Sequence, residues 1–368
     1  MSRFALVVTA LLAVAYSYVA SRLAVGPVSA VLLAVPFLLI WILPVYYWGS
    51  SRSREGLIDK LIHRASYLSM AWVSFALVFT LARDLALLAT LGAPSLHTMV
   101  ATAGVPVVLG GSLLAMACGA AAAFRGPRLE RIDLPVPGLH ADLDGFRIVQ
   151  ISDLHVGPNI GRRYVQRVAE LSRSLQPDLV VLTGDIVDGP VARLAPHVAP
   201  LAALASDGRA FFILGNHDCY AGAGAWIAHF REMGMRVLLN SHELVRQGAA
   251  RLLVGGVVDP AYGKARPDAN AAMAGAPAAD FRLLLAHNPR LATLGAAAGF
   301  DLQLSGHTHA GQFFPWTLAV RLVHAPHVAG LSREGRMLVY VSAGTGTWGP
   351  PVRFGTRPEL TLIRLVRT

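Results

Sequence analysis

Hydrophobic residues gather near the N-terminus in four long runs, and farther along the chain they occur in short runs separated by polar segments. Each long run approaches or exceeds the ~20 apolar residues that a helix needs to cross a ~30 Å hydrocarbon core. A cleavable signal peptide is the alternative for the first run, since Arg3 precedes it, but the three further runs favour a membrane domain over residues 1–127. The expected spans are roughly residues 4–25, 27–48, 66–91 and 98–124.

The pattern changes at about residue 128. Residues 128–145 are polar and contain proline and glycine, which predicts a linker to a second domain over 146–368. In that domain, short apolar runs alternate with segments of helical period at 161–176, 197–206 and 223–234. Near-continuous apolar strands between helices indicate an α/β domain with buried sheets.

Polar residues follow five of the short apolar runs. Ligand sites in open α/β sheets lie outside the carboxyl ends of the strands, so these residues are expected to converge. Histidine is the commonest metal ligand near neutral pH, and the pair in "GHTH" suggests a metal site. The residues are Asp153 and His155 in "ISDLH", Asp185 and Asp188 in "LTGDIVDG", Asn216 and His217 in "ILGNHDCY", His287 in "LLLAHNP", and His307 and His309 in "LSGHTH".

The types of these side chains indicate which metals would bind. Three carboxylates or amides and four imidazoles exceed the needs of one tetrahedral ion. Mixed nitrogen and oxygen ligands without thiolate suit Mn²⁺, Fe or Zn²⁺, with Mg²⁺ a poorer match. Seven ligands divide between two ions if one carboxylate bridges, and two ions about 3.5–4 Å apart can clamp a phosphoryl group and activate water.

Five motifs together, D-x-H, G-D-x-x-D-G, G-N-H-D, H-N-P and G-H-T-H, resemble those of the calcineurin-like metallophosphoesterases over roughly residues 140–368. The strings "QISDLHVG", "HTHAGQ" and "VSAGTGTWGPP" are similar to the YaeI/YkuE-like branch and to transmembrane proteins that carry a metallophosphoesterase domain. The resemblance implies a four-layer α-β-β-α sandwich. It also implies that one metal binds Asp153, His155, Asp185 and His309 and the other Asp185, Asn216, His287 and His307, with Asp185 bridging.

The same resemblance assigns roles to the remaining motif residues. His217 is the non-ligand histidine at the reacting phosphate, Asp188 is its acidic partner, and Asp218 is structural. A hydroxide that bridges the metals would attack phosphorus, while His217 stabilises the transition state or protonates the leaving oxygen.

These observations predict a membrane-anchored hydrolase of phosphodiesters or pyrophosphates. Soluble nucleotide diesters and lipid-linked phosphates both fit as substrates, and a membrane sensor that keeps the metal site without hydrolysis is the competing class. Next to His309 the aromatic and aliphatic residues Phe313, Phe314, Trp316 and Leu318 could enter a bilayer interface or pack in the core. No substrate-binding residue is assigned; Arg162, Arg163 and Arg353 fit phosphate contact and surface solvation equally.

Charge bears on both partners and orientation. The net charge is +10, but apart from Lys60 and Lys264 the basic residues are arginines without a basic run, so no nucleic-acid partner is expected. Two cysteines, Cys118 and Cys219, cannot form a disulfide framework. Arginines gather on the side of the membrane that carries the C-terminal domain, which predicts an integral protein of a bacterial inner or plasma membrane with a cytoplasmic catalytic domain.

Three other features of the sequence could indicate function but also have ordinary structural explanations. "GTGTWG" at 344–349 matches a dinucleotide motif, but Pro350 and Pro351 prevent the helix that such a site needs, so a loop near the metals is expected. His324 and His327 are expected to be ordinary loop histidines. Arg83 and Asp84 lie within the third apolar run, where ionisable groups are functional candidates, although a position at the membrane interface also accounts for them.

Overall fold

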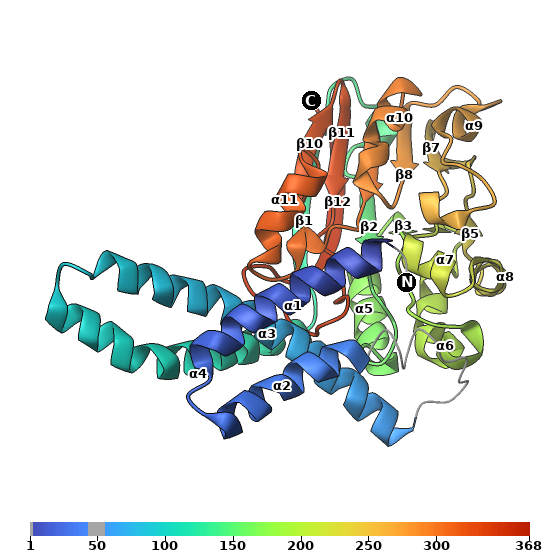
Figure 1. The fold of residues 1–368 in the computed structure, drawn as a ribbon. Helices are drawn as coiled ribbons and strands as arrows, with labels where there is room; N and C mark the ends of the chain where they lie inside the picture. The colour runs from blue at the N-terminus through green and yellow to red at the C-terminus, as the bar shows by residue number, and fades with distance from the viewer. Residues whose placement is uncertain (1–2, 43–55) are drawn as a thin grey trace. The chain divides into compact units, whose positions relative to one another are not determined.

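The computed structural model describes residues 3–42 and 56–368, with the backbone alone for 3–9 and 41–42. They form two compact units. The helical unit comprises Met1–Ala121 and Gly349–Phe354, and the α/β unit comprises Ala122–Trp348 and Gly355–Thr368. Figure 1 draws the N-terminal part of the helical unit in blue and cyan and most of the α/β unit from green to red.

Within residues 3–42 and 56–121, the helical unit has the helices α1 (Arg3–Leu23), α2 (Pro27–Ile42) and α3 (Leu57–Ala89), and most of α4 (Pro94–Phe124). Of these, α3 and α4 are long and apolar enough to cross a membrane. In α1 and α2 the described apolar stretches, Ala10–Leu23 and Pro27–Ile40, are shorter than a span requires. Two of the four expected spans therefore meet the criterion, and the other two are not confirmed.

The limits of the expected spans also need correction. The expected second and third spans leave residues 49–65 as a loop between them. In the structure, α3 begins at Leu57, nine residues before the predicted start of the third span. The end of the expected second span, residues 43–48, lies outside the described residues, as do Arg52 and Arg54.

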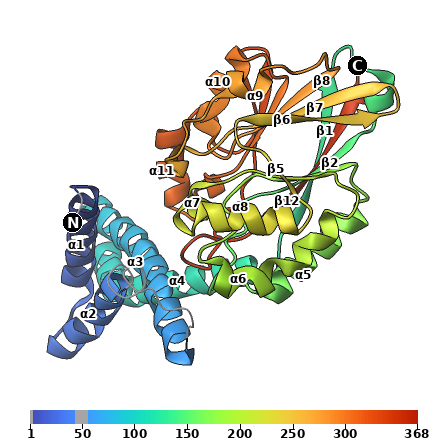
Figure 2. The ribbon, with the colours of Figure 1, turned by 90° about the vertical axis from the view of Figure 1, so that its right-hand side faces the viewer.

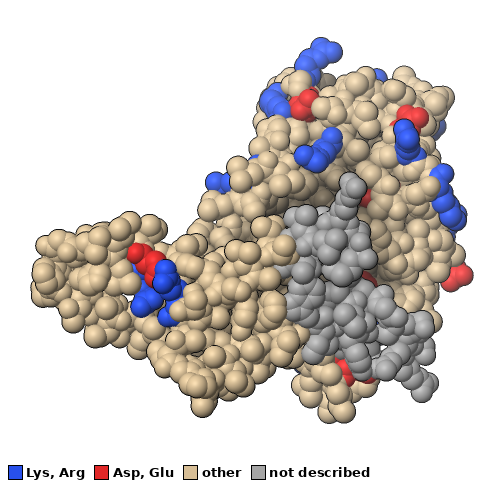
Figure 3. All heavy atoms as spheres, viewed as in Figure 1, with Lys and Arg blue, Asp and Glu red and all other residues tan. Residues whose placement is uncertain are grey.

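In Figure 3 the visible face of the helical unit carries almost no charge apart from one small mixed cluster.

Asp84 of α3 has partners within the helical unit. Its Oδ2 lies 2.8 Å from Nε of Arg22 and accepts a hydrogen bond of 2.8 Å from the Tyr18 hydroxyl, both on α1. Arg83 contributes a longer contact of 3.4 Å. A carboxylate in an apolar helix is costly unless it is paired, so these contacts explain how α3 accommodates Asp84 and tie it to α1.

A six-residue segment near the C-terminus, Gly349–Phe354, also belongs to the helical unit. Val352 and Arg353 are fully buried there, and the Arg353 amide donates to the Gly119 carbonyl at 2.9 Å. Gly119 has no space for a side chain, because a Cβ atom would lie 2.5 Å from Val352. Arg353 is therefore not a surface residue, which was one of the two roles that the sequence left open.

The α/β unit is built on two six-stranded sheets. The first has the order β1-β12-β2-β3-β4-β5 and the second the order β10-β11-β9-β8-β7-β6. The first consists of β1 (Arg128–Val136), β2 (Arg147–Ile151), β3 (Leu179–Leu182), β4 (Ala210–Phe212), β5 (Arg236–Val237) and β12 (Glu359–Arg367). The second consists of β6 (Ser241–Gln247), β7 (Ala250–Gly256), β8 (Phe281–Leu285), β9 (Leu302–Ser305), β10 (Gly330–Glu334) and β11 (Met337–Val341).

Helices cover the outer faces of both sheets (Figure 2). Apolar residues of α5 (Arg162–Ser174), α6 (Val191–Val198) and α8 (Ala223–Glu232) share one core with the first sheet. Those of α9 (Ala269–Met273) and α10 (Ala292–Ala297) share another with the second sheet. A third core, with Ile148, Phe211 and Leu283, lies between the sheets. This is the expected four-layer α-β-β-α arrangement.

The expected linker over residues 128–145 is wrong in its first half. Residues Arg128–Val136 form β1, which pairs in parallel with β12 from Arg128↔Glu359 to Val136↔Arg367. Only residues 125–127 separate β1 from the end of α4. Three residues span at most about 11 Å, far less than the ~60 Å that the 18 residues of the expected linker could reach.

Candidate metal centre

The candidate ligands follow the carboxyl ends of five strands, as the sequence predicted. Asp153 and His155 come after β2, and Asp185 comes after β3. Strands β2, β3 and β4 run parallel in the first sheet, and β7, β8 and β9 run parallel in the second. Their carboxyl ends therefore present side chains at one edge of each sheet. The remaining candidates are Asn216 after β4, His287 after β8, and His307 and His309 after β9.

One group of ligands consists of Asp153, His155 and His309, all buried. Nε2 of His155 and Nε2 of His309 lie 3.0 Å apart, and Nε2 of His309 lies 3.4 Å from Oδ1 of Asp153. Two imidazole nitrogens and a carboxylate oxygen directed at one point are the donors of a transition-metal site.

A second group consists of Asp185, His287 and His307, with Asn216 beside it. Nε2 of His287 lies 3.1 Å from Oδ2 of Asp185 and 3.3 Å from Nδ1 of His307. The amide oxygen of Asn216 lies 2.9 Å from the same Nδ1. These four side chains offer two imidazole nitrogens and two oxygens, a donor set that fits a divalent ion.

Asp185 lies between the two groups. Its Oδ2 is 3.1 Å from Nε2 of His287 in the second group and 3.9 Å from Nε2 of His155 in the first. The structure thus brings all seven predicted ligands together, with one carboxylate oxygen facing histidines of both groups.

His217 lies at the start of α7 (Asn216–Tyr220) beside the first group. Its Nδ1 is 2.9 Å from Oδ1 of Asp188, the pairing that the sequence predicted. The same Oδ1 is 2.8 Å from Nδ1 of His155, a contact that the sequence analysis missed. Nδ1 of each imidazole faces Asp188, and Nε2 of His155 faces His309.

The charges in the site depend on one another. Burial alone would lower the pKa of His155, but Asp188 and Asp185 raise it to about 9. Burial and the His287 charge lower the pKa of His307 to about 3. Burial would raise the pKa of Asp185, but His287 and His155 hold it far below its usual range. Divalent cations would balance the same carboxylates, and their binding must displace the proton on His155.

The backbone at the ligands is strained. Among the described residues nine non-glycine residues have positive φ, and five of them are candidate ligands: Asp153, His155, Asp185, His307 and His309. Such conformations cost of order 1–3 kcal/mol each and cluster at functional sites. The surroundings leave little freedom, since a Cβ atom on Gly306 would lie 2.0 Å from Oδ2 of Asp153.

Asp218 organises the loop that carries Asp185. Its carboxylate accepts from the amides of Asp185, Ile186, Val187 and Gly215 at 2.8–3.1 Å. Burial and the Asp185 charge raise the pKa of Asp218 to about 7. These contacts agree with the structural role expected of it.

Two histidines in the segment after the site differ in their surroundings. His327 is buried and bonds Ser332 and Glu334 at 2.8 and 3.0 Å. His324 ends α11 (Trp316–His324), and its ring lies 5.3 Å from that of His307. The sequence predicted that His324 is an ordinary loop histidine. Instead it ends a helix and borders the candidate metal centre.

The dinucleotide-like segment 344–349 forms a loop beside the first group of ligands. The amides of Thr345 and Gly346 donate to the carbonyls of Ser152 and Asp153 at 2.7 and 3.0 Å. The loop presents Trp348 to His217, with the ring centroids 5.9 Å apart. The segment is a loop, as expected, and it lies beside the candidate ligand Asp153. The sequence did not predict the contact of Trp348 with His217.

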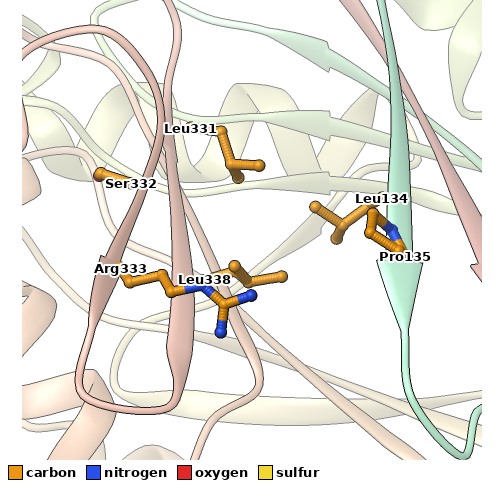
Figure 4. Close-up of a pocket in the computed structure, with 6 residues that line it drawn as sticks. All are labelled: Leu134, Pro135, Leu331, Ser332, Arg333 and Leu338. Carbon is orange, nitrogen blue, oxygen red and sulfur yellow. The ribbon is translucent and has the colours of Figure 1, made fainter.

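A cavity of 190 Å³ lies elsewhere in the α/β unit, lined by residues of β1, β10 and β11 (Figure 4). Its lining includes Leu134, Leu338 and one charged residue, Arg333. None of the candidate ligands lines it, so the cavity is separate from the metal centre.

The chain is similar to several known proteins. Residues 146–311 match the model of the family described as "Calcineurin-like phosphoesterase". The "Transmembrane protein with metallophosphoesterase domain" of Danio rerio is 36% identical over 258 residues, 66% of this chain and 58% of that protein. The "Uncharacterized metallophosphoesterase YkuE" of Bacillus subtilis is 30% identical over 236 residues, 61% of this chain and 80% of that protein.

The chain spans less than two thirds of the Danio rerio protein, 58% of its length. Among solved structures, the 5′-nucleotidase precursor from Thermus thermophilus aligns with a TM-score of 0.39 and 16% identity, covering 60% of this chain and 54% of that one. A likeness at this level carries no functional conclusion.

Proposed function

Since the chain belongs to the calcineurin-like metallophosphoesterase family, we propose that it hydrolyses a phosphodiester or pyrophosphate bond at a dinuclear metal centre. The observation that carries the proposal is the position of Asp185, whose Oδ2 faces His287 at 3.1 Å and His155 at 3.9 Å. A carboxylate in this position can serve two ions at once. One ion alone would leave several of the buried donors unused.

In this proposal, each group of ligands holds one divalent ion, Mn²⁺, Fe or Zn²⁺. When bound, the ions supply Lewis acidity and an activated water for attack on phosphorus. Asp185 is shared by both. The other ligands are Asp153, His155 and His309 for one ion and Asn216, His287 and His307 for the second.

His217 is proposed to act on the substrate. The contact of its Nδ1 with Asp188 fixes the ring and leaves Nε2 to meet the phosphoryl or leaving-group oxygen. A protonated imidazole there can stabilise developing charge or donate a proton to the leaving oxygen.

The membrane supplies the second part of the proposal. The apolar helices and the transmembrane relative support membrane association, and we propose that the α/β unit faces the cytoplasm. A lipid-linked substrate is favoured by α11, which follows the His309 turn and has no buried residue. Trp316, Leu318, Leu322 and Val323 are between 47% and 89% exposed. Such a surface suits contact with a bilayer.

The substitution Asp185→Asn tests the metal centre. An amide is a weaker ligand than a carboxylate, so the purified full-length variant is expected to lose most of both ions and nearly all hydrolysis of bis(4-nitrophenyl) phosphate. Metal analysis and the rate assay measure the two effects. Asp268→Asn is the matched control, because Asp268 only caps α9 and asparagine caps equally well.

Full activity in Asp185→Asn, or after thorough chelation, would contradict the dinuclear mechanism. A wild-type protein that binds two ions but hydrolyses neither diesters nor pyrophosphates would instead favour the membrane sensor.

A further inference from the structure

Two exposed aromatic rings flank the proposed general acid. The ring of Tyr220 lies 5.7 Å from that of His217 at an interplanar angle of 61°, and the ring of Trp348 lies 5.9 Å away at 73°. Tyr220 is 74% exposed and Trp348 is 48% exposed. Large aromatic faces left open at a reacting centre contribute little to the fold and offer contact area to a ligand.

The position of Trp348 is fixed by hydrogen bonds to Gln312. The Trp348 amide donates to Oε1 of Gln312 at 2.8 Å, and Nε2 of Gln312 donates to the Trp348 carbonyl at 2.8 Å. Gln312 is buried and follows the His309 turn, where its own amide donates to the His309 carbonyl at 2.8 Å. The tryptophan is therefore held by the same turn that presents a metal ligand.

The residues before Trp348 are equally constrained. Gly346 lies against the Asp153 strand end, where a Cβ atom would be 2.1 Å from the Leu154 carbonyl oxygen. The Tyr164 hydroxyl donates to the Thr345 carbonyl at 2.6 Å. The loop thus presents Trp348 on a backbone tied to both sides of the metal centre.

Tyr220 is placed by the helix that carries His217. It is the last residue of α7, three positions after His217, so the two side chains lie on the same face of one helical turn. Trp348 and Tyr220 approach the imidazole of His217 from segments far apart in the sequence. Each aromatic ring is steeply inclined to the plane of the imidazole.

From this arrangement we propose that Tyr220 and Trp348 determine specificity for a leaving group that carries a planar aromatic ring. The inference rests on the proposed function, in which His217 protonates the leaving oxygen. A group bonded to that oxygen must pass beside the imidazole, where the exposed rings of Trp348 and Tyr220 can stack on it. Alkyl leaving groups gain less, because they lack a π face.

Two phosphonates test the inference without turnover. Phenylphosphonate and ethylphosphonate carry the same anionic group for the metals and differ in the ring. Isothermal titration of the metal-loaded full-length protein is expected to show phenylphosphonate binding about 10-fold more tightly, the size of one aromatic stacking contact. Trp348→Leu should reduce this preference to about 2-fold or less with unchanged metal content, whereas Trp348→Phe should keep most of it.

The controls separate stacking from structural effects. Trp316→Leu removes a tryptophan of similar exposure from α11, 47%, and should leave the preference intact. Tyr220→Leu should lower the preference by several-fold. In kinetics, Trp348→Leu should reduce kcat/KM about 10-fold for bis(4-nitrophenyl) phosphate and much less for bis(2,2,2-trifluoroethyl) phosphate.

Equal affinity of the wild type for both phosphonates, or a preference that survives in Trp348→Leu, would overturn the inference while leaving the metal centre intact. Equal losses of kcat/KM on both diesters would show that Trp348 only supports His217. A metal-loaded protein that binds neither phosphonate would contradict the proposed function itself and this inference with it.

Discussion

A single carboxylate oxygen contacts two histidines for which we propose different roles. Oδ1 of Asp188 contacts Nδ1 of His155 and Nδ1 of His217 at 2.8 and 2.9 Å. The contact engages Nδ1 of His155, so that Nε2, which faces His309, is the nitrogen that would bind a metal; a carboxylate behind a ligating histidine is a familiar arrangement. It also positions His217 toward the substrate. Asp188 therefore links the metal ligands to the proposed acid.

We predict different outcomes for substitutions of these two partners. His217→Ala should leave the metal content unchanged and lower turnover by roughly 10²–10⁴, the usual contribution of a general acid. Asp188→Asn should lower both metal affinity and turnover, because the Asp188 carboxylate orients His155 as well as His217. Metal analysis and initial rates on a diester measure both effects. Loss of metal from His217→Ala would show that His217 is itself a ligand.

The sequence predicted which side chains lie together at the strand ends, because each motif is a short strand end with its loop and such local units keep their geometry. It did not reveal the second contact of Asp188 or the approach of Trp348 to His217. Both depend on how loops from distant parts of the chain pack against each other. Nor did it distinguish Phe313, which is buried, from Trp316, which is exposed.

At the scale of elements, β1 shows why a strand was mistaken for a linker. It lies at the edge of the first sheet, and only Leu134 of its nine residues is buried. Charged residues and Pro135 are tolerated there, because an edge strand has one side free of sheet hydrogen bonds. The buried strands, by contrast, have apolar runs that reveal them directly.

Helix α11 exposes most of its large apolar residues and has a polar residue beside the candidate metal centre. Leu318 and Leu322 are four positions apart and share a face, and both are exposed. His324 on the same helix instead contacts the ring of His307. The orientation is the reverse of that of an ordinary surface helix, whose apolar face is turned to the core.

We therefore predict that the double substitution of Leu318 and Leu322 to serine affects lipid substrates selectively. Each buried leucine is worth ~1.5–3 kcal/mol, so hydrolysis of a micellar phospholipid or lipid pyrophosphate should fall at least about 10-fold. Hydrolysis of a soluble diester should not change. Leu294→Ser on α10 is the control, because Leu294 is 43% exposed. Equal losses on both substrates, with a lower melting temperature, would mean that the face belongs to the core.

For the whole molecule, the charges around α3 and α4 bear on orientation. Lys60 and Arg64 lie near the start of α3, Arg125 follows α4, and the turn between the helices, residues 90–93, has no charged residue. From the positive-inside rule we predict that both charged ends face the cytoplasm. The prediction is the same for two spans or four, because an additional pair returns the chain to the same side.

The predicted topology can be tested with reporters. A reporter fused after Thr368 should behave as cytoplasmic, and a tag inserted at Gly92 should be accessible from outside. Protease protection in sealed vesicles measures both positions. The reverse pattern would require an odd number of spans or an exported α/β unit.

Segments near the C-terminus pack against much earlier parts of the chain, and this has a consequence for folding during synthesis. Strand β1 pairs with β12, and the helical unit includes Gly349–Phe354. Neither unit can therefore complete its packing until the ribosome has made these C-terminal segments, although α1–α4 and β1 emerge first. At ~5–20 residues per second, β1 waits roughly 10–50 s for its partner. During that time the unpaired edge of β1 could pair with another strand. The charged side chains and Pro135 of β1 disfavour such pairing while the chain is still being made.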